Sequence, residues 1–128
     1  MEDSVVYYIY KEVHFSAAHQ LREYNGKCEN LHGHNWKVRA FLKSKELDSL
    51  GMVEDFSLLK KRLNDILDTL DHHFLNDVPP FDIINPSAEN IAKFLFDELK
   101  KNWSTGRVTV AKVEVWESQN SCAIYEEQ

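Results

Sequence analysis

The chain has 128 residues, of which 43% are hydrophobic and 28% are charged, and its formal net charge is −6. This length and this ordinary composition predict one globular domain over residues 1–128. An acidic chain without a dense Lys/Arg cluster is not expected to bind nucleic acid, and no apolar run approaches the ~20 residues that a membrane span needs.

The chain begins with Met-Glu-Asp-Ser, which is acidic where a secretory signal would be basic, and this predicts a cytoplasmic protein. Residues 5–19 then alternate with period two and predict a strand with one buried face. That face carries Val13, Phe15, Ala17 and His19. A lone histidine at such a place would be interpreted as a hydrogen-bonded core residue. Two further histidines nearby favour a metal ligand at His19.

A turn signal at Asn25-Gly26 lets the chain reverse into a second predicted strand. The even positions of that strand share one face: His32, His34, Trp36, Val38, Ala40 and Leu42. His32 and His34 are two residues apart and project to the same face, so two imidazoles can converge on one ion. A catalytic zinc site typically has three protein ligands and one open position, and His19 is the leading candidate for the third ligand.

The two cysteines, Cys28 and Cys122, could pair, but a reducing cytoplasm and the histidines near Cys28 favour free thiols. We interpret Cys122 as a small hydrophobic residue in a strand. Cys28 comes four residues before His32, so a thiol precedes the predicted metal ligands. This stretch is where we expect chemistry.

After a polar connection through Gly51, a helix is predicted that Asp55 or Ser57 can cap. Its apolar residues recur at helical spacing and are interpreted as core packing: Leu59, Leu63, Ile66, Leu67 and Leu70. At the end of this helix Asp71 and His72 are adjacent, which by itself is a weak signal.

Three prolines predict a loop over residues 76–86, and Ser87 can cap a second helix. The apolar face of that helix would carry Ile91, Phe94, Leu95 and Leu99. Both predicted helices are therefore amphipathic and can cover one face of a sheet.

Residues 108–117 alternate again and predict a third strand, and residues 121–126 predict a short closing strand after a turn. One face of the third strand would carry Thr109, Ala111, Val113, Val115 and Glu117. The order of elements is therefore ββααββ. A charged residue at a strand end is usually solvated, so Glu117 becomes a functional candidate only if this end opens on the metal.

Six segments form a recognisable set in this order and spacing. They are Phe-Ser-Ala-Ala-His (15–19), Cys-x-x-x-His-Gly-His (28–34), Gly-Met-Val-x-Asp-Phe (51–56), Leu-Asp-His-x-x-Leu-Asn (70–76), Pro-Ser-Ala-Glu-Asn (86–90) and Glu-Ser (117–118). Over nearly the whole chain, this set resembles the 6-pyruvoyl-tetrahydropterin synthase family, in particular its bacterial branch of 6-carboxy-tetrahydropterin synthases in queuosine biosynthesis.

The resemblance implies roles for the candidate residues. It implies a zinc ion held by three histidines, His19, His32 and His34. It also implies catalytic roles for four residues: Cys28 as the proton-abstracting thiol, Asp71 and His72 as a proton relay, and Glu117 as the anchor of the pterin ring. The family has Pro-Thr where this chain has Pro86-Ser87, so Ser87 keeps the hydroxyl near the substrate. Glu89 is expected to face the same pocket.

The resemblance also implies an α+β tunnelling fold, in which a four-stranded antiparallel sheet has two helices packed on one side. Such a sheet alone leaves two edges unpaired, and joining sheets edge to edge into an oligomeric barrel removes those edges. The implied assembly is a homohexamer made of two trimers, with active sites at subunit interfaces. Cys28, Asp71 and Glu117 of one site need not come from the same chain.

The reaction implied is that of a zinc-dependent carbon-carbon lyase, which converts 7,8-dihydroneopterin triphosphate to 6-carboxy-5,6,7,8-tetrahydropterin, acetaldehyde and triphosphate. One alternative is 6-pyruvoyl-tetrahydropterin synthase, which uses the same substrate and metal and keeps the carbon side chain. The three residues between Cys28 and His32 favour the carboxy-forming branch, because the animal pyruvoyl enzymes have a longer gap. Another alternative is a non-catalytic zinc-binding module, which predicts a closed site with four ligands.

Overall fold

The computed structural model describes residues 4–23 and 30–128 and shows the predicted order ββααββ. Its elements are β1 (Tyr7–His19), β2 (His32–Ser44), α1 (Phe56–Leu67), α2 (Ala88–Lys100), β3 (Thr109–Ser118) and β4 (Ser121–Glu126), with a short 3-10 helix η2 (Leu75–Asp77) between the helices. The predicted α+β class is confirmed. Within the described ranges, no helix has the length and apolar character to cross a membrane.

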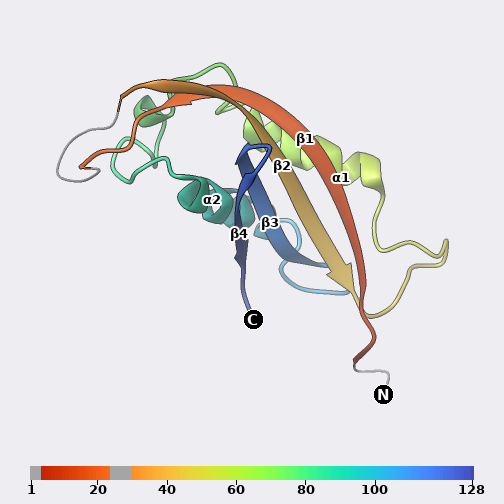
Figure 1. Cartoon of the computed structure of the whole chain (residues 1–128). Coiled ribbons are helices and arrows are strands. Elements are labelled where there is room, and N and C mark those ends of the chain that lie inside the picture. The colour runs from red at the N-terminus through yellow and green to blue at the C-terminus, as the bar shows by residue number, and fades with distance from the viewer. Residues whose placement is uncertain (1–3, 24–29) are drawn as a thin grey trace.

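The four strands form one antiparallel sheet in the order β1-β2-β3-β4. Strands β1 and β2 are a long curved hairpin (Figure 1), and their register sets His19 opposite His32 and Ala17 opposite His34. The two histidine-bearing strand ends are therefore brought together by pairing alone. Hydrogen-bonded neighbours in a sheet lie only about 5 Å apart, so side chains on the same face of these ends can share a ligand.

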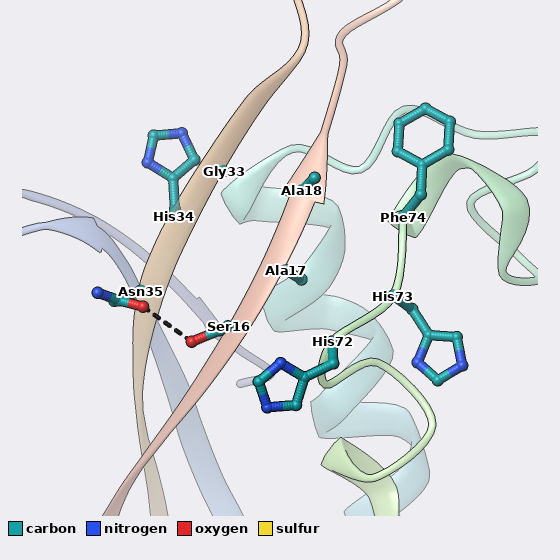
Figure 2. Close-up of a pocket in the computed structure, with 9 residues that line it drawn as sticks. All are labelled: Ser16, Ala17, Ala18, Gly33, His34, Asn35, His72, His73 and Phe74. Atoms are coloured by element: carbon teal, nitrogen blue, oxygen red, sulfur yellow. Dashed lines mark hydrogen bonds between the residues drawn. The ribbon is translucent and has the colours of Figure 1, made fainter.

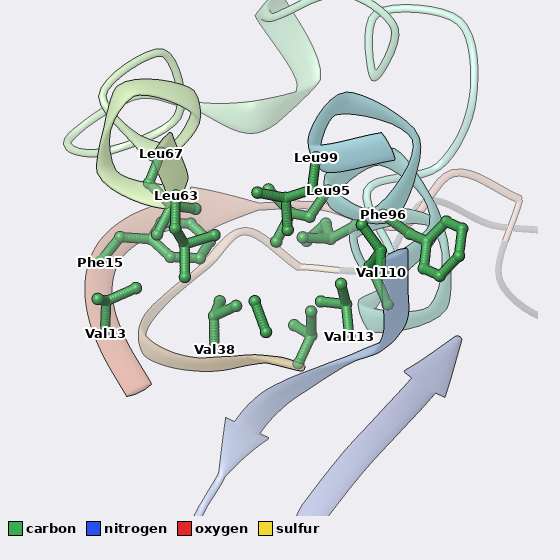
Figure 3. Close-up of a cluster of buried hydrophobic side chains, with 14 of the residues drawn as sticks. Val13, Phe15, Val38, Leu63, Leu67, Leu95, Phe96, Leu99, Val110 and Val113 are labelled. Atoms are coloured by element: carbon green, nitrogen blue, oxygen red, sulfur yellow. The ribbon is translucent and has the colours of Figure 1, made fainter. Parts of the chain in front are cut away.

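Both helices pack on one face of the sheet, as Figure 3 shows. Each helix buries one stripe of leucine and isoleucine, with Leu59, Leu63 and Leu67 from α1 and Ile91, Leu95 and Leu99 from α2. The strands contribute buried side chains to the same core, including Phe15, Trp36, Val38 and Val113. Burying each large apolar side chain stabilises the fold by roughly 1.5–3 kcal/mol. This core holds the sheet, and with it the histidine-bearing ends, in one shape.

Strand β3 departs from the predicted alternation. Leu42 pairs with Val110 and Phe41 with Lys112, which leaves Ala111 as one extra residue in β3. Val110 therefore shares the covered face with Val113, as Figure 3 shows. The prediction that Thr109 and Ala111 lie on this face is wrong, because a bulge shifts the period of two by one residue.

The N-termini of both helices are capped by side chains. Asp55 accepts a hydrogen bond of 2.7 Å from the Ser57 amide at the start of α1, so Asp55 rather than Ser57 is the cap. Ser87 accepts a hydrogen bond of 3.1 Å from the Asn90 amide at the start of α2, as predicted. The second cap lies directly beside the candidate site.

The other face of the sheet is not covered by helices and carries charged and aromatic side chains. Arg39 donates a 2.8 Å hydrogen bond to Glu12, and this contact lowers the pKa of the Glu12 carboxyl below its ordinary value. The Lys37 ammonium lies 4.2 Å from the centre of the Trp116 ring, next to Cys122 on the neighbouring strand. Cys122 lies in a strand, β4, as predicted, and it is exposed there and not part of the core.

Candidate active site

The three predicted metal ligands lie together at the end of the β1-β2 hairpin. One ring nitrogen each of His19, His32 and His34 can be chosen so that all three lie within 4.8 Å of one another. Zinc binds nitrogen ligands at about 2.0–2.1 Å, so the nitrogens of a tetrahedral site lie roughly 3.4 Å apart. The strand pairing thus produces a site that fits one metal ion.

The orientation of His19 shows which of its nitrogens is available. The ring is 1% exposed, and Nδ1 lies 2.8 Å from the carbonyl oxygen of Pro86. A carbonyl oxygen only accepts hydrogen bonds, so Nδ1 carries the hydrogen and Nε2 keeps a free electron pair. Nε2 is buried and has no hydrogen-bond partner among residues 4–23 and 30–128. A buried nitrogen without a partner destabilises a fold by about 1–3 kcal/mol. A metal ion bound to Nε2 would supply the missing partner.

Glu117 reaches the histidines from the end of β3. Its carboxylate oxygens lie 3.7 Å from Nε2 of His19 and 3.8 Å from Nε2 of His34. These distances exceed those of hydrogen bonds, and the Glu117 side chain is 37% exposed, so it remains open to a further partner. The strand end does open on the candidate metal site, which was the condition for treating Glu117 as functional.

Trp36 forms the apolar wall behind the histidines. Its ring centre lies 4.9 Å from that of His19 and 5.3 Å from that of His34, both edge to face. The indole N–H donates a buried hydrogen bond of 3.3 Å to the Ala17 carbonyl, which fixes the ring. The sequence pattern identified Trp36 as a core residue but contained no sign that it packs against two of the predicted metal ligands.

Asp71 and His72 form a second group beside β1. The Ser16 amide donates a 2.9 Å hydrogen bond to Oδ1 of Asp71, and Oδ2 lies 3.6 Å from Nε2 of His72. The chain here pairs with the edge of β1 through an isolated parallel bridge, in which the His72 amide donates to the Ser16 carbonyl and the Ala18 amide to the His73 carbonyl. The His72 side chain is 81% exposed. Within one chain it is therefore not shielded from water.

One open pocket of about 470 Å³ is lined by one residue of each group, His34 and His72. Figure 2 shows strands β1 and β2 running between these two rings in this view. The Ser16 hydroxyl donates a 2.8 Å hydrogen bond to the Asn35 side-chain oxygen, so the Asn35 amide nitrogen points away from Ser16 (Figure 2). Neither Ser16 nor Asn35 was predicted as a site residue, because each is an ordinary polar residue on the outward face of a strand.

Three predicted site residues remain: Ser87, Glu89 and Cys28. The Ser87 hydroxyl caps α2 beside Pro86, and Glu89 is exposed in the first turn of the same helix. Cys28, the predicted base, and the Asn25-Gly26 turn lie outside the described residues. The roles of Cys28, Ser87 and Glu89 stay predictions.

Three comparisons with known proteins agree with one another. A model of the family described as 6-pyruvoyl tetrahydropterin synthase matches residues 8–128. The 6-carboxy-5,6,7,8-tetrahydropterin synthase of Synechocystis sp. is 40% identical over 122 residues, which cover 91% of each chain. Human 6-pyruvoyl tetrahydrobiopterin synthase is 35% identical over 129 residues, which cover 90% of this chain and 88% of the human protein. The structure of Caenorhabditis elegans 6-pyruvoyl tetrahydropterin synthase has a TM-score of 0.83 at 32% identity and covers 96% of both chains.

Proposed function

Because the chain belongs to the 6-pyruvoyl tetrahydropterin synthase family and is an enzyme, we propose that it is a zinc-dependent carbon-carbon lyase of pterin metabolism. Its reaction converts 7,8-dihydroneopterin triphosphate to 6-carboxy-5,6,7,8-tetrahydropterin, acetaldehyde and triphosphate, in cytoplasmic queuosine biosynthesis. The observation that carries this proposal is the convergence of His19, His32 and His34 beside Glu117. Two observations support the carboxy product: the relative from Synechocystis sp. is named 6-carboxy-5,6,7,8-tetrahydropterin synthase, and the spacing from Cys28 to His32 is short.

Zinc is the proposed ion because imidazole nitrogens suit it, and three of them leave one position open. When bound, zinc supplies a Lewis acid that acidifies C–H and O–H bonds of the substrate side chain. The tautomer of His19 fits this role, since its hydrogen is on Nδ1 and its Nε2 lies 3.7 Å from the Glu117 carboxylate, which also approaches Nε2 of His34.

The other residues of the chain are proposed to move protons and hold the ring. Cys28 takes a proton as a general base, for which its pKa must lie below the usual ~8.5 of a thiol. Asp71 is fixed at one oxygen by the Ser16 amide, so its other oxygen can orient His72 and stabilise its charged form. Glu117 accepts hydrogen bonds from the pterin N–H and amino groups in a charge-assisted contact, with Ser87 and Glu89 at the same pocket.

The proposed assembly is a homohexamer of two trimers with active sites at subunit interfaces. The exposure of His72 supports this proposal, because a catalytic proton relay works best where water is excluded and a second copy would cover it. The open edge of β1 beyond the residue 72–74 segment also supports it, since unpaired edges favour strand addition.

Product analysis tests this function. The zinc-loaded protein is incubated with 7,8-dihydroneopterin triphosphate, and mass spectrometry is expected to detect 6-carboxytetrahydropterin together with acetaldehyde. The His32→Ala variant should lose stoichiometric zinc and form neither product. A pterin that keeps all its side-chain carbons would establish the pyruvoyl alternative. Full zinc occupancy without any turnover would instead indicate a non-catalytic zinc module.

A further inference from the structure

The carbonyl group that holds His19 is itself held on both sides. Pro86 carries this carbonyl, which lies 2.8 Å from Nδ1 of His19 in a buried contact. Proline has no N–H group, so the backbone of Pro86 cannot donate a hydrogen bond that would fix it. Its position depends on its two neighbours, Asn85 and Ser87.

Asn85 is tied to the chain just beyond His19. The Arg22 amide donates a 2.8 Å hydrogen bond to the Asn85 side-chain oxygen, and the Asn85 side-chain nitrogen donates one of 3.1 Å to the Arg22 carbonyl. This pair of bonds holds residue 85 to residue 22 as a strand partner would. The Arg22 guanidinium reinforces it with a 2.6 Å hydrogen bond to the Phe81 carbonyl in the same loop.

Asn90 bridges the two neighbours of Pro86. Its side-chain nitrogen donates a 2.9 Å hydrogen bond to the Asn85 carbonyl, and its backbone amide donates one of 3.1 Å to the Ser87 hydroxyl. Residues 85 and 87 are thus both anchored to Asn90 in the first turn of α2. The peptide between them carries the carbonyl that orients His19.

We propose that Asn90 is a positioning residue for the metal site. Asn90 binds the residues on both sides of Pro86 and so fixes the position of the Pro86 carbonyl. That carbonyl keeps the hydrogen of His19 on Nδ1 and leaves Nε2 available for the ion. This inference rests on the proposed metal site and adds a residue that touches neither the metal nor the substrate. Partners that orient metal-binding histidines typically contribute about 10–100-fold to metal affinity.

Two variants separate this role from simple support of α2. Asn90→Asp keeps the size of the side chain and the backbone cap, and an acidic residue suits the first turn of a helix, yet it cannot donate to the Asn85 carbonyl. Asn90→Ala removes the side chain altogether. Asp55→Ala is the matched control, because it removes the side-chain cap of the other helix, α1.

The measurements are the zinc dissociation constant of the full-length chain, by competition with a coloured chelator, and the visible absorption spectrum after cobalt(II) substitution. Both Asn90 variants are expected to bind zinc about 10–100-fold more weakly and to show a changed cobalt spectrum. Asp55→Ala should have a lower thermal midpoint with unchanged zinc affinity and spectrum. If Asn90→Ala does not fold, Asn90→Asp decides the question.

The outcomes distinguish this inference from the proposal on which it rests. Wild-type zinc affinity and a wild-type cobalt spectrum in folded Asn90→Asp would overturn the positioning role and leave the metal site intact. A loss of affinity in Asp55→Ala equal to that in the Asn90 variants would also overturn it, because general destabilisation would then explain the effect. A wild-type chain that binds no zinc would overturn the metal site and this inference together.

Discussion

His72 is held in a backbone conformation that is uncommon for residues other than glycine. Its φ angle is 59°, in the left-handed region that glycine occupies without strain. The hydrogen bond from its amide to the Ser16 carbonyl maintains this conformation, and Asp71 beside it is tied to the same strand residue. Residues in such conformations cluster at active sites, which agrees with the predicted proton relay.

We expect His72→Gly to be more stable than His72→Ala by about 1 kcal/mol, because alanine keeps the clash of Cβ in the left-handed region. Both variants should lose turnover while keeping zinc. Chemical denaturation gives the stability difference, and product formation gives the turnover. Equal stability of the two variants would show that the position is unstrained, and normal turnover would remove His72 from the mechanism.

At the scale of single elements, the side-chain pattern predicted most of the sheet and both helices. Alternation of period two placed His19 and His34 on the covered face, and capping chemistry placed the starts of α1 and α2. The bulge at Ala111 was missed, because one extra residue in a strand leaves no compositional trace. The role of the Pro86 carbonyl could not be predicted either, since a backbone oxygen has no signature in a sequence.

The cap of α1 provides a test at this scale. Asp55→Ala should lower the free energy of unfolding by about 1 kcal/mol, because the Ser57 amide loses its acceptor at the helix start. Asp55→Asn keeps a side-chain oxygen and should lose far less. Denaturation curves of the two variants measure the effect. Equal losses would mean that the negative charge at the helix terminus, rather than the hydrogen bond, is what stabilises α1.

At the scale of the whole molecule, the candidate site divides into two groups with different surroundings. The histidines and Glu117 lie together on the helix-covered face, at one end of the sheet. His72, in contrast, is exposed beside β1. From the sequence, only the family resemblance predicted that these residues belong to one site. Their separation within one chain is a property of the fold and is what an interface between copies would resolve.

Mixing two inactive variants tests the proposed interface. If Cys28 and His72 of one active site come from different chains, hybrids of Cys28→Ala and His72→Ala should regain turnover that neither variant has alone. Light scattering should show a particle that is a multiple of the 15.0 kDa chain. A monomeric particle, or hybrids without recovered turnover, would place every residue of a site in one chain.

The pairing of the residue 72–74 segment with β1 also bears on how the protein folds. The hydrogen bond between Ser16 and Asp71 joins residues 55 positions apart, whereas the β1-β2 hairpin closes through near neighbours. Closing the longer loop loses more chain entropy, so this segment should join the sheet after the hairpin and α1 have formed. The same contact should be among the first to open in the native state. Amide hydrogen exchange would reveal this as faster exchange at Ala18 and His72 than at Trp36. On this reasoning, the predicted proton relay is the last part of the site to form.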